Sequence, residues 1–386
     1  MEVKPFKIDV PDAVLADLQD RLDRSRLAAD FGNDDWRYGF NGDYLRELVD
    51  HWRTDYDWRA HEKAMNAFPH FRTEIDGVPI HFIHVKGKGP NPTPLILTHG
   101  WPWTFWDYRE LIGPLSDPAA YGGDPADAFD IVIPSLPGYG FSSPLDKTGI
   151  NFWRTADLWV KLMEGLGYPR FASHGEDWGA FITAQLGHKY ADRLIGVHLT
   201  TMFPLDMFAG GEVEPLHGEG EESWAQKNAD FFTHESGYFQ IQATKPQTLA
   251  YAMQDSPVGL CAWLVEKRRT WGHTRGEIES RFSKDDMLTT VMLYWVTDSF
   301  GTSARYYYEA VHNLWAPSHD RRPVVEAPTG IAVFLEELVL QPRRWAERYY
   351  NLKQWTIYSE GGHFAAFEEP ATVVEDIRRF FRSLPR

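Results

Sequence analysis

The sequence predicts an α/β protein in which a mostly parallel central sheet is flanked by helices, with a helical extension at the N-terminus and a helical cap inserted into the core. Three observations support this fold class. From residue 71, short apolar runs alternate with helical segments, as they do in βαβ units. The alternation stops over residues 203–323, where helical and aromatic-rich sequence prevails. It resumes at residue 330, so the insertion splits the core.

The N-terminal extension is predicted to cover residues 1–70. Residues 7 to about 66 show a helical pattern, because Leu15, Leu18 and Leu22 recur at helical spacing. No strand is expected before residue 71, where the apolar period changes from that of a helix to that of a strand.

The first part of the core, residues 71–202, is predicted to begin with a hairpin and to continue with parallel strands. The expected strands cover residues 71–75, 80–85, 94–98, 129–133, 171–173 and 194–200. The expected helices lie near 106–111, at 153–166 and at about 180–190. After the cap at 203–323, the second part of the core at 324–386 is expected to hold strands 330–335 and 355–358 and a final helix at 371–384.

Composition and charge exclude several classes of function. With 39 Lys and Arg against 55 Asp and Glu, the net charge of -16 disfavours nucleic acid and membrane partners. The N-terminus lacks a signal-like apolar run and no later segment has the apolar length of a membrane span, so a cytoplasmic protein is expected. The lone cysteine, Cys261, is expected to be buried filler. Aromatic residues make up 15% of the chain, which suits an apolar pocket and is compatible with a homodimer.

Asp177 follows one predicted strand and precedes a predicted helix. Gly175 and Gly179 lie two residues before and two after it, and small residues there permit the sharp turn that presents a nucleophile. The alternative is that Asp177 merely caps the helix. Two further sites favour the functional interpretation, since Glu336-Glu337 and His363 follow later strands in the order nucleophile, acid, histidine of α/β-hydrolase folds.

A turn after strand 94–98 carries the string His99-Gly100-Trp101-Pro102. The backbone N–H groups of Trp101 and Trp178 are predicted to form an oxyanion hole near the nucleophile. His99 is interpreted as a structural hydrogen-bonding residue, and the Trp101-Pro102 bond is a candidate cis peptide.

With these motifs the chain resembles the microsomal-type epoxide hydrolases over nearly its whole length. The matching strings are 99–102, 175–179, 237–242 with 244–246, 255–260, 305–309 and 361–370. The resemblance implies Asp177 as nucleophile, His363 as base, Glu337 as the acid that orients it, and Tyr238 and Tyr307 as the phenols that hold the epoxide oxygen. Glu336 could replace Glu337, and Tyr306 or Tyr308 could replace Tyr307, if the register shifts by one.

Two residues depart from the family pattern. Glu176 stands where glycine is common, and strand alternation predicts that it points away from the pocket into solvent. The bulky Trp103 follows the His-Gly-Trp-Pro string, where it would narrow the pocket entrance or pack on the N-terminal segment. Trp103 and Phe364 are the expected substrate-binding residues.

These residue types suit one reaction. An aspartate is ionised at neutral pH, since its reference pKa is about 3.9, so it can attack an epoxide carbon without first losing a proton. Neutral phenols can donate to the oxygen that leaves, and water activated by His363 would then hydrolyse the Asp177 ester. The expected partners are water and a small apolar or aromatic epoxide, with no cofactor and no metal. A metal site is disfavoured because His81 and His84 would face opposite sides of a strand.

Other functions remain open as alternatives. A haloalkane dehalogenase also uses an elbow aspartate, and Trp178 would suit its halide site. A non-catalytic ligand-binding protein of this fold is the alternative from another class. A serine esterase is disfavoured because no G-x-S-x-G string lies on a strand-to-helix turn. For an epoxide hydrolase, the resemblance leaves both detoxification and natural-product assembly, of the enediyne or polyketide kind, as biological roles.

Overall fold

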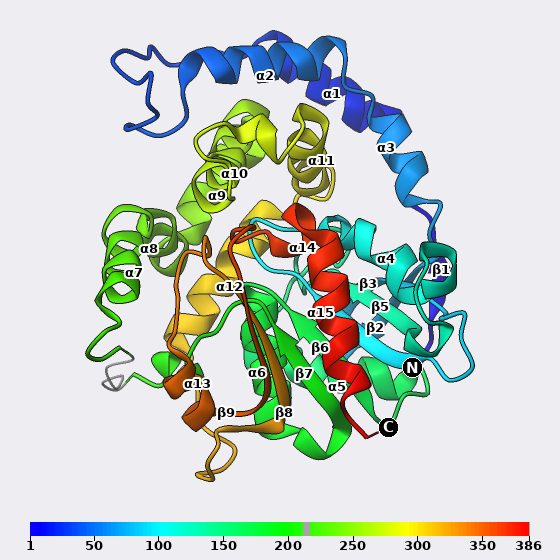
Figure 1. Cartoon of the computed structure of the whole chain (residues 1–386). Coiled ribbons are helices and arrows are strands. Elements are labelled where there is room, and N and C mark those ends of the chain that lie inside the picture. The colour runs from blue at the N-terminus through cyan, green and yellow to red at the C-terminus, as the bar shows by residue number, and fades with distance from the viewer. Residues whose placement is uncertain (211–216, 386) are drawn as a thin grey trace.

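A nine-stranded sheet forms the centre of the computed structural model, which describes residues 1–210 and 217–385 (Figure 1). The strand order is β1-β2-β3-β5-β4-β6-β7-β8-β9. The strands are β1 (Lys4–Phe6), β2 (His70–Ile75), β3 (Val78–Val85), β4 (Thr93–Thr98), β5 (Phe129–Pro134), β6 (Phe171–Gly175), β7 (Leu194–Leu199), β8 (Val325–Phe334) and β9 (Tyr350–Tyr358). Strands β1, β2, β3 and β5 pair antiparallel, and the rest of the sheet is parallel. The predicted mostly parallel α/β sheet is confirmed.

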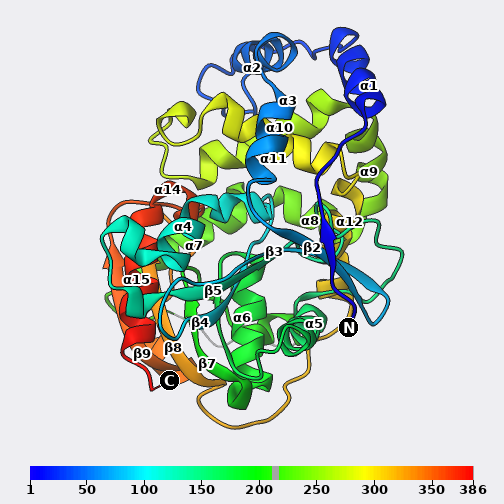
Figure 2. The ribbon, with the colours of Figure 1, turned by 90° about the vertical axis from the view of Figure 1, so that its right-hand side faces the viewer.

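Helices cover both faces of the parallel part of the sheet, as a parallel sheet requires (Figure 2). On one face α5 (Phe152–Gly165) packs against α6 (Trp178–Lys189), and on the other α4 (Arg109–Ser116) packs against α15 (Pro370–Arg382). Strands β5 and β6 are consequently buried at every residue. The short helices α13 (Arg343–Tyr349) and α14 (Ala365–Glu368) precede β9 and α15.

The chain between β7 and β8 forms a helical layer. In Figure 1 this layer lies above and to the left of the sheet. Its helices are α7 (Glu222–His234), α8 (Gly237–Thr244), α9 (Pro246–Asp255), α10 (Pro257–Trp271), α11 (Lys284–Trp295) and α12 (Phe300–His312), and we refer to them together as the cap. Short 3-10 helices are η1 (Phe105–Tyr108), η2 (Pro118–Tyr121), η3 (Pro125–Asp127), η4 (Ala191–Arg193), η5 (Leu205–Phe208) and η6 (Ile278–Ser280).

The N-terminal extension contains one strand that the sequence did not predict. β1 pairs antiparallel with β2 at the edge of the sheet, and its three residues are too few to show a strand period. Helices α1 (Asp12–Asp23), α2 (Gly42–Thr54) and α3 (Trp58–Met65) follow, and α1 and α2 lie across the cap helices α10 and α11 (Figure 1). The extension therefore connects the sheet edge to the far side of the cap.

Two strand boundaries and one helix also differ from the sequence prediction. Strands β8 and β9 begin several residues earlier than expected, and helix α13 was not predicted. Tertiary pairing explains the strands, because β8 and β9 continue to pair with each other beyond the apolar runs that mark them in the sequence. Among the helices of residues 1–210 and 217–385, none is both long enough and apolar enough to cross a bilayer.

Candidate active site

Asp177 lies in a strained turn between β6 and α6. Its backbone has φ 51° and ψ -123°, a conformation that non-glycine residues rarely adopt. The two flanking glycines are required sterically: a Cβ on Gly175 would lie 2.0 Å from the Gly179 carbonyl oxygen, and one on Gly179 would lie 1.8 Å from the Thr98 carbonyl oxygen. The turn therefore forms only where small residues surround the aspartate.

The turn after β4 approaches the carboxylate of Asp177. The Trp101 N–H donates to Asp177 Oδ1 at 2.7 Å, and the Trp101-Pro102 peptide is cis. Trp178 is the first residue of α6, where backbone N–H groups have no acceptor within the helix. His99 is buried and hydrogen-bonds the Gly100 carbonyl at 2.9 Å through Nδ1, and burial lowers its pKa to about 4. It stays neutral and structural in this position.

His363 and Glu337 complete a buried triad with Asp177. His363 Nδ1 lies 2.7 Å from Glu337 Oε1, and His363 Nε2 lies 3.4 Å from Asp177 Oδ2. Glu337 also accepts hydrogen bonds from the Thr201 hydroxyl and from the Leu338 N–H. Glu336 instead has a half-exposed side chain, so Glu337 is the residue of the pair that contacts the histidine.

The charge of His363 depends on its two carboxylate neighbours. Burial alone disfavours the imidazolium, but the charge of Glu337 and contact with Asp177 outweigh burial and raise the pKa of His363 to about 10. The same interaction keeps the pKa of buried Glu337 below its ordinary value. With a pKa of about 10, His363 is protonated at neutral pH.

Two cap tyrosines face the nucleophile. Tyr238 of α8 and Tyr307 of α12 both line the cavity that contains Asp177. Burial and the nearby Asp177 charge raise the pKa of both phenols well above the ordinary value, so both stay neutral. Tyr306 contacts the Thr155 hydroxyl at 2.8 Å and Tyr308 is exposed, so neither takes the place of Tyr307.

The cavity above Asp177 has a volume of about 70 Å³ and an aromatic wall. Six phenylalanines line it, namely Phe181, Phe203, Phe208, Phe231, Phe232 and Phe239. The ionisable residues in its lining are Asp177, Glu337, His363 and the two tyrosines. Within the described part of the chain, Tyr307 Oη is buried without a hydrogen-bond partner, and the buried His363 Nε2 has the 3.4 Å contact with Asp177 but no hydrogen bond. Orphaned polar atoms in an apolar cavity are available to a bound oxygen.

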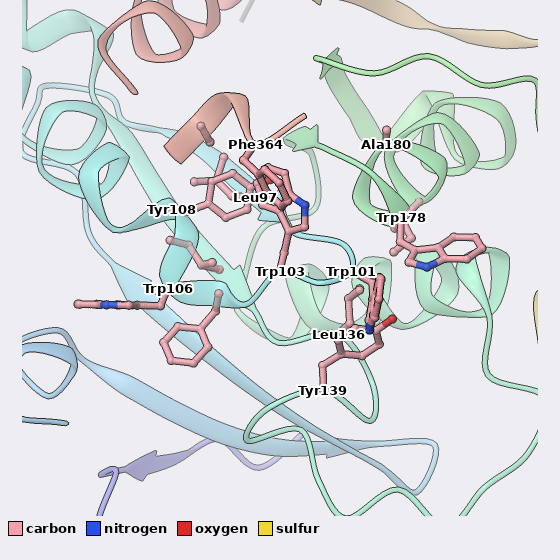
Figure 3. Close-up of a cluster of buried hydrophobic side chains, with 14 of the residues drawn as sticks. Leu97, Trp101, Trp103, Trp106, Tyr108, Leu136, Tyr139, Trp178, Ala180 and Phe364 are labelled. Carbon is pink, nitrogen blue, oxygen red and sulfur yellow. The ribbon is translucent and has the colours of Figure 1, made fainter. Parts of the chain in front are cut away.

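Trp103 and Phe364 do not line this cavity, contrary to expectation. Both are fully buried, and their ring centroids lie 5.1 Å apart (Figure 3). Phe364 belongs to the base loop, which we define as residues 361–366. Trp103 also contacts the His363 ring edge to face at 5.8 Å. Trp103 lies in the turn after β4, where its N–H donates to the Gly100 carbonyl at 3.3 Å and its ring also packs against Tyr108 of η1.

Glu176 points away from the cavity as expected, but the prediction that it is solvated is wrong. Its exposed fraction is 0%, and its carboxylate lies 3.5 Å from His174 Nε2. Strand alternation places Glu176 on the same side as His174, and that side of the sheet is covered by helices rather than by water.

Two residues that hold the base loop were missed by the sequence analysis. Glu368 accepts the backbone N–H groups of Phe364 and His273 at 3.0 and 2.7 Å, and Arg268 of α10 lies 4.1 Å from the Phe364 ring. Glu368 stands in the 361–370 string, yet nothing in the sequence indicates that its carboxylate turns back to the loop. Arg268 gives no signal in sequence, because its partner Asp107 is distant in the chain.

Comparison with known proteins agrees with this geometry. Residues 3–108 match the family described as epoxide hydrolase N terminus, and residues 93–370 match the alpha/beta hydrolase fold family. The chain is 43% identical to the "Putative epoxide hydrolase" of Stigmatella aurantiaca, covering 99% of this chain and 85% of that protein. It is 37% identical to epoxide hydrolase 1 of Oryctolagus cuniculus, covering 98% and 88%.

Among solved structures, the juvenile hormone epoxide hydrolase of the silkworm Bombyx mori superposes with a TM-score of 0.86 at 30% identity, covering 99% of this chain and 95% of that one. The predicted α/β-hydrolase fold is confirmed by these matches, and so is the predicted family. The chain belongs to the microsomal-type epoxide hydrolases.

Proposed function

We propose that the protein converts an epoxide and water to a vicinal diol through a covalent ester on Asp177. The observation that carries the proposal is the position of the Asp177 carboxylate, which lies between the Trp101 N–H and His363 and below two neutral phenols in an apolar cavity. An ionised carboxylate can attack a ring carbon directly, whereas a hydroxyl would need a base.

In the first step, an Asp177 oxygen bonds to a ring carbon and the ring C–O bond breaks. Tyr238 or Tyr307 donates its phenolic proton to the oxygen that leaves, which gives an alcohol and a phenolate. Glu337 still faces His363 once Asp177 is an ester, but the second carboxylate that raises the pKa of His363 is gone. The pKa of His363 therefore falls, and His363 gives its proton to the phenolate. The base is thereby neutral when it is needed.

In the second step, neutral His363 takes a proton from water as the hydroxide adds to the ester carbonyl carbon. The Trp101 N–H, which already contacts Asp177 Oδ1, and the Trp178 N–H would stabilise the oxyanion. The diol oxygen leaves with the proton from His363, and the Asp177 acid then protonates His363 again. Epoxide plus water thus gives diol, and every group returns to its first state.

We infer that the substrate is a small apolar or aromatic epoxide, because aromatic rings form most of the cavity wall. The cavity of about 70 Å³ is smaller than a typical ligand site, so the cap has to move to admit such a molecule. We further propose that residues 203–323 act as the cap and that the protein is a cytoplasmic homodimer. Its biological role is proposed to be natural-product assembly or detoxification. A broad panel of simple epoxides would separate the two roles.

The covalent step is tested by mass spectrometry of a His363→Gln variant. Glutamine cannot take the proton from water, so the ester should accumulate. We expect an adduct with the mass of the added epoxide, located on the peptide that contains Asp177.

The control is the double variant Asp177→Asn/His363→Gln, which should carry no adduct. Consumption of the epoxide with an unmodified Asp177 would contradict the proposal and indicate direct hydration. Halide release from haloalkanes by the native enzyme, without diol formation from epoxides, would favour the dehalogenase alternative.

A further inference from the structure

A chain of four buried ionisable residues runs from the nucleophile turn through the sheet to α15. Glu176 Oε1 lies 3.5 Å from His174 Nε2, His174 Nδ1 lies 2.9 Å from His198 Nδ1, and His198 Nε2 lies 2.9 Å from Asp376 Oδ1. All four residues have an exposed fraction of 0%. His174 and His198 are register partners on β6 and β7, so the sheet itself holds the two rings together.

The contacts of this chain can be compared with the number of protons that its side chains carry. The His174–His198 and His198–Asp376 hydrogen bonds each need one proton. Among the residues that the structure describes, Glu176 Oε1 and His174 Nε2, 3.5 Å apart, are both buried without a hydrogen-bond partner, so a hydrogen bond between them would need a third proton. Two neutral imidazoles and two carboxylates supply only two. With Asp376 ionised, His198 donates from Nε2 and accepts from His174 at Nδ1, which leaves a bare His174 Nε2 facing a Glu176 carboxylate oxygen. That arrangement is repulsive and buried, so it is strongly disfavoured.

We infer that the chain holds a third proton, shared between Glu176 and His174, and that Glu176 is thereby a positioning residue for the reaction. The proton keeps a second full negative charge from forming beside Asp177. The catalytic consequence rests on the proposed function, whereas the proton itself does not.

Glu176 also connects the nucleophile turn to the base loop. Its Oε2 accepts the Ala366 N–H at 3.4 Å, and Ala366 lies three residues after His363, in the first turn of α14. Glu176 thus contacts the segment that carries His363 and is also the residue directly before Asp177 in the chain. Loss of the shared proton would leave an uncompensated charge at that junction and displace both reacting groups.

The groups that face the pair determine its pH response. Tyr108 of η1 lies against the His174 ring at 5.8 Å and stays neutral, because burial raises its pKa well above the ordinary value. Asp177 and His363 lie on the cavity side. At the outer end, Asp376 accepts from Tyr358 and pairs with the half-exposed Arg379, so protons can exchange with solvent there. Desolvation opposes the ionised form of Asp376, but His198, Tyr358 and Arg379 outweigh it and lower its pKa to about 2.

The proton is tested first in the resting enzyme, without substrate. We would record nitrogen NMR spectra of labelled histidine, assigned with a His174→Gln variant, and an infrared difference spectrum between the native enzyme and Glu176→Gln. The expected result at pH 7 is either a protonated Glu176 carboxyl or a protonated His174 Nε2. An ionised Glu176 facing a bare His174 Nε2 would overturn the inference, whatever the enzyme does with epoxides.

The positioning role is tested by pH–rate profiles of Glu176→Gln and Glu176→Ala. The glutamine amide can donate to His174 and accept from Ala366, so we expect kcat within about threefold of the native value and the loss of one alkaline ionisation. Alanine should lower kcat at least tenfold, with little change in KM. Glu375→Gln, an exposed neighbour of Asp376 on α15, is the charge-matched control and should keep the native profile. A glutamine variant as impaired as the alanine variant, or one with an unchanged alkaline limb, would refute the role.

Discussion

The nucleophile turn shows how tightly single residues are constrained around Asp177. Its strained backbone is held by the strand before it, by the helix after it and by the Trp101 N–H on its carboxylate. Gly100 is constrained by the nucleophile itself, because a Cβ there would lie 2.0 Å from Asp177 Oδ1. The site therefore requires a residue without a side chain at position 100.

We predict that Gly100→Ala lowers kcat by roughly 100-fold, since a displacement of about 1 Å at a reacting atom has an effect of that size. Steady-state kinetics and adduct formation by mass spectrometry would measure it. Gly237→Ala is the matched control, because a Cβ at that helical residue meets no atom within 4 Å. Equal activity of the two variants would show that the close approach of Gly100 to the Asp177 carboxylate is not needed for activity.

At the scale of elements, the cap helix α10 is coupled to the base loop through Arg268. Its guanidinium pairs with Asp107 at 2.6 Å and stacks on Phe364, and both charged side chains are almost fully buried. Removing one partner of a buried pair leaves the other charge uncompensated. The position of the cap over the site and the position of His363 are thus linked by one side chain.

Arg268→Met should lower the free energy of unfolding by about 3–5 kcal/mol, measured by denaturant titration. Arg269→Met, its neighbour on the outer side of α10, should lose no more than about 1 kcal/mol. Adding Asp107→Asn to Arg268→Met should recover part of the loss. If Arg268→Met were as stable as the native protein, the Arg268–Asp107 pair would contribute nothing to stability.

Glu368 gives the base loop a pH-dependent stability. Burial raises its pKa from the ordinary value to about 6, although backbone N–H groups oppose the shift. A carboxyl with a raised pKa stabilises the fold below its unfolded pKa, and that contribution is lost as pH rises through about 6.

The difference in unfolding free energy between the native protein and Glu368→Gln should therefore change by about 2 kcal/mol between pH 4 and pH 8. Stability curves at several pH values would measure it, and the native protein should lose stability relative to the variant as pH rises. If the unfolding free energies of the two proteins changed in parallel with pH, the raised pKa of Glu368 would be contradicted.

At the scale of the whole molecule, the N-terminal extension joins the sheet edge to the cap. β1 pairs with β2, while α1 and α2 cover the outer side of α10 and α11 (Figure 1). Polar contacts add to this packing, including Arg21 with Asp255 and the Tyr56 hydroxyl with that of Thr289 at 3.0 Å. The cap is thus held between the extension and the core.

Leu48→Ala, on the buried face of α2, should lower the free energy of unfolding by about 2–5 kcal/mol. Hydrogen exchange measured by mass spectrometry should rise in α10 and α11 more than in β4 and β6, because the extension covers the cap. The exposed Leu314→Ala is the control and should change stability by no more than about 0.5 kcal/mol. A uniform rise in exchange would mean that the extension stabilises the whole fold rather than the cap.

The sequence by itself determined the fold class, the family and the residues of the nucleophile turn. Local signals sufficed there, since strand and helix periods and the glycines around Asp177 act over a few neighbouring residues. The choice of Glu337 over Glu336 and of Tyr307 over its neighbours could only be inferred from the family, because one residue of register reverses the direction of a side chain.

Only the tertiary structure decided what surrounds these residues. Glu176 lies on the predicted side of its strand, but whether that side faces water depends on helices that are distant in sequence. The contacts of Glu176 with His174, of His198 with Asp376 and of Arg268 with Asp107 are likewise invisible in the sequence. Burial and long-range pairing set the charge of each group, and they exist only once the chain has folded.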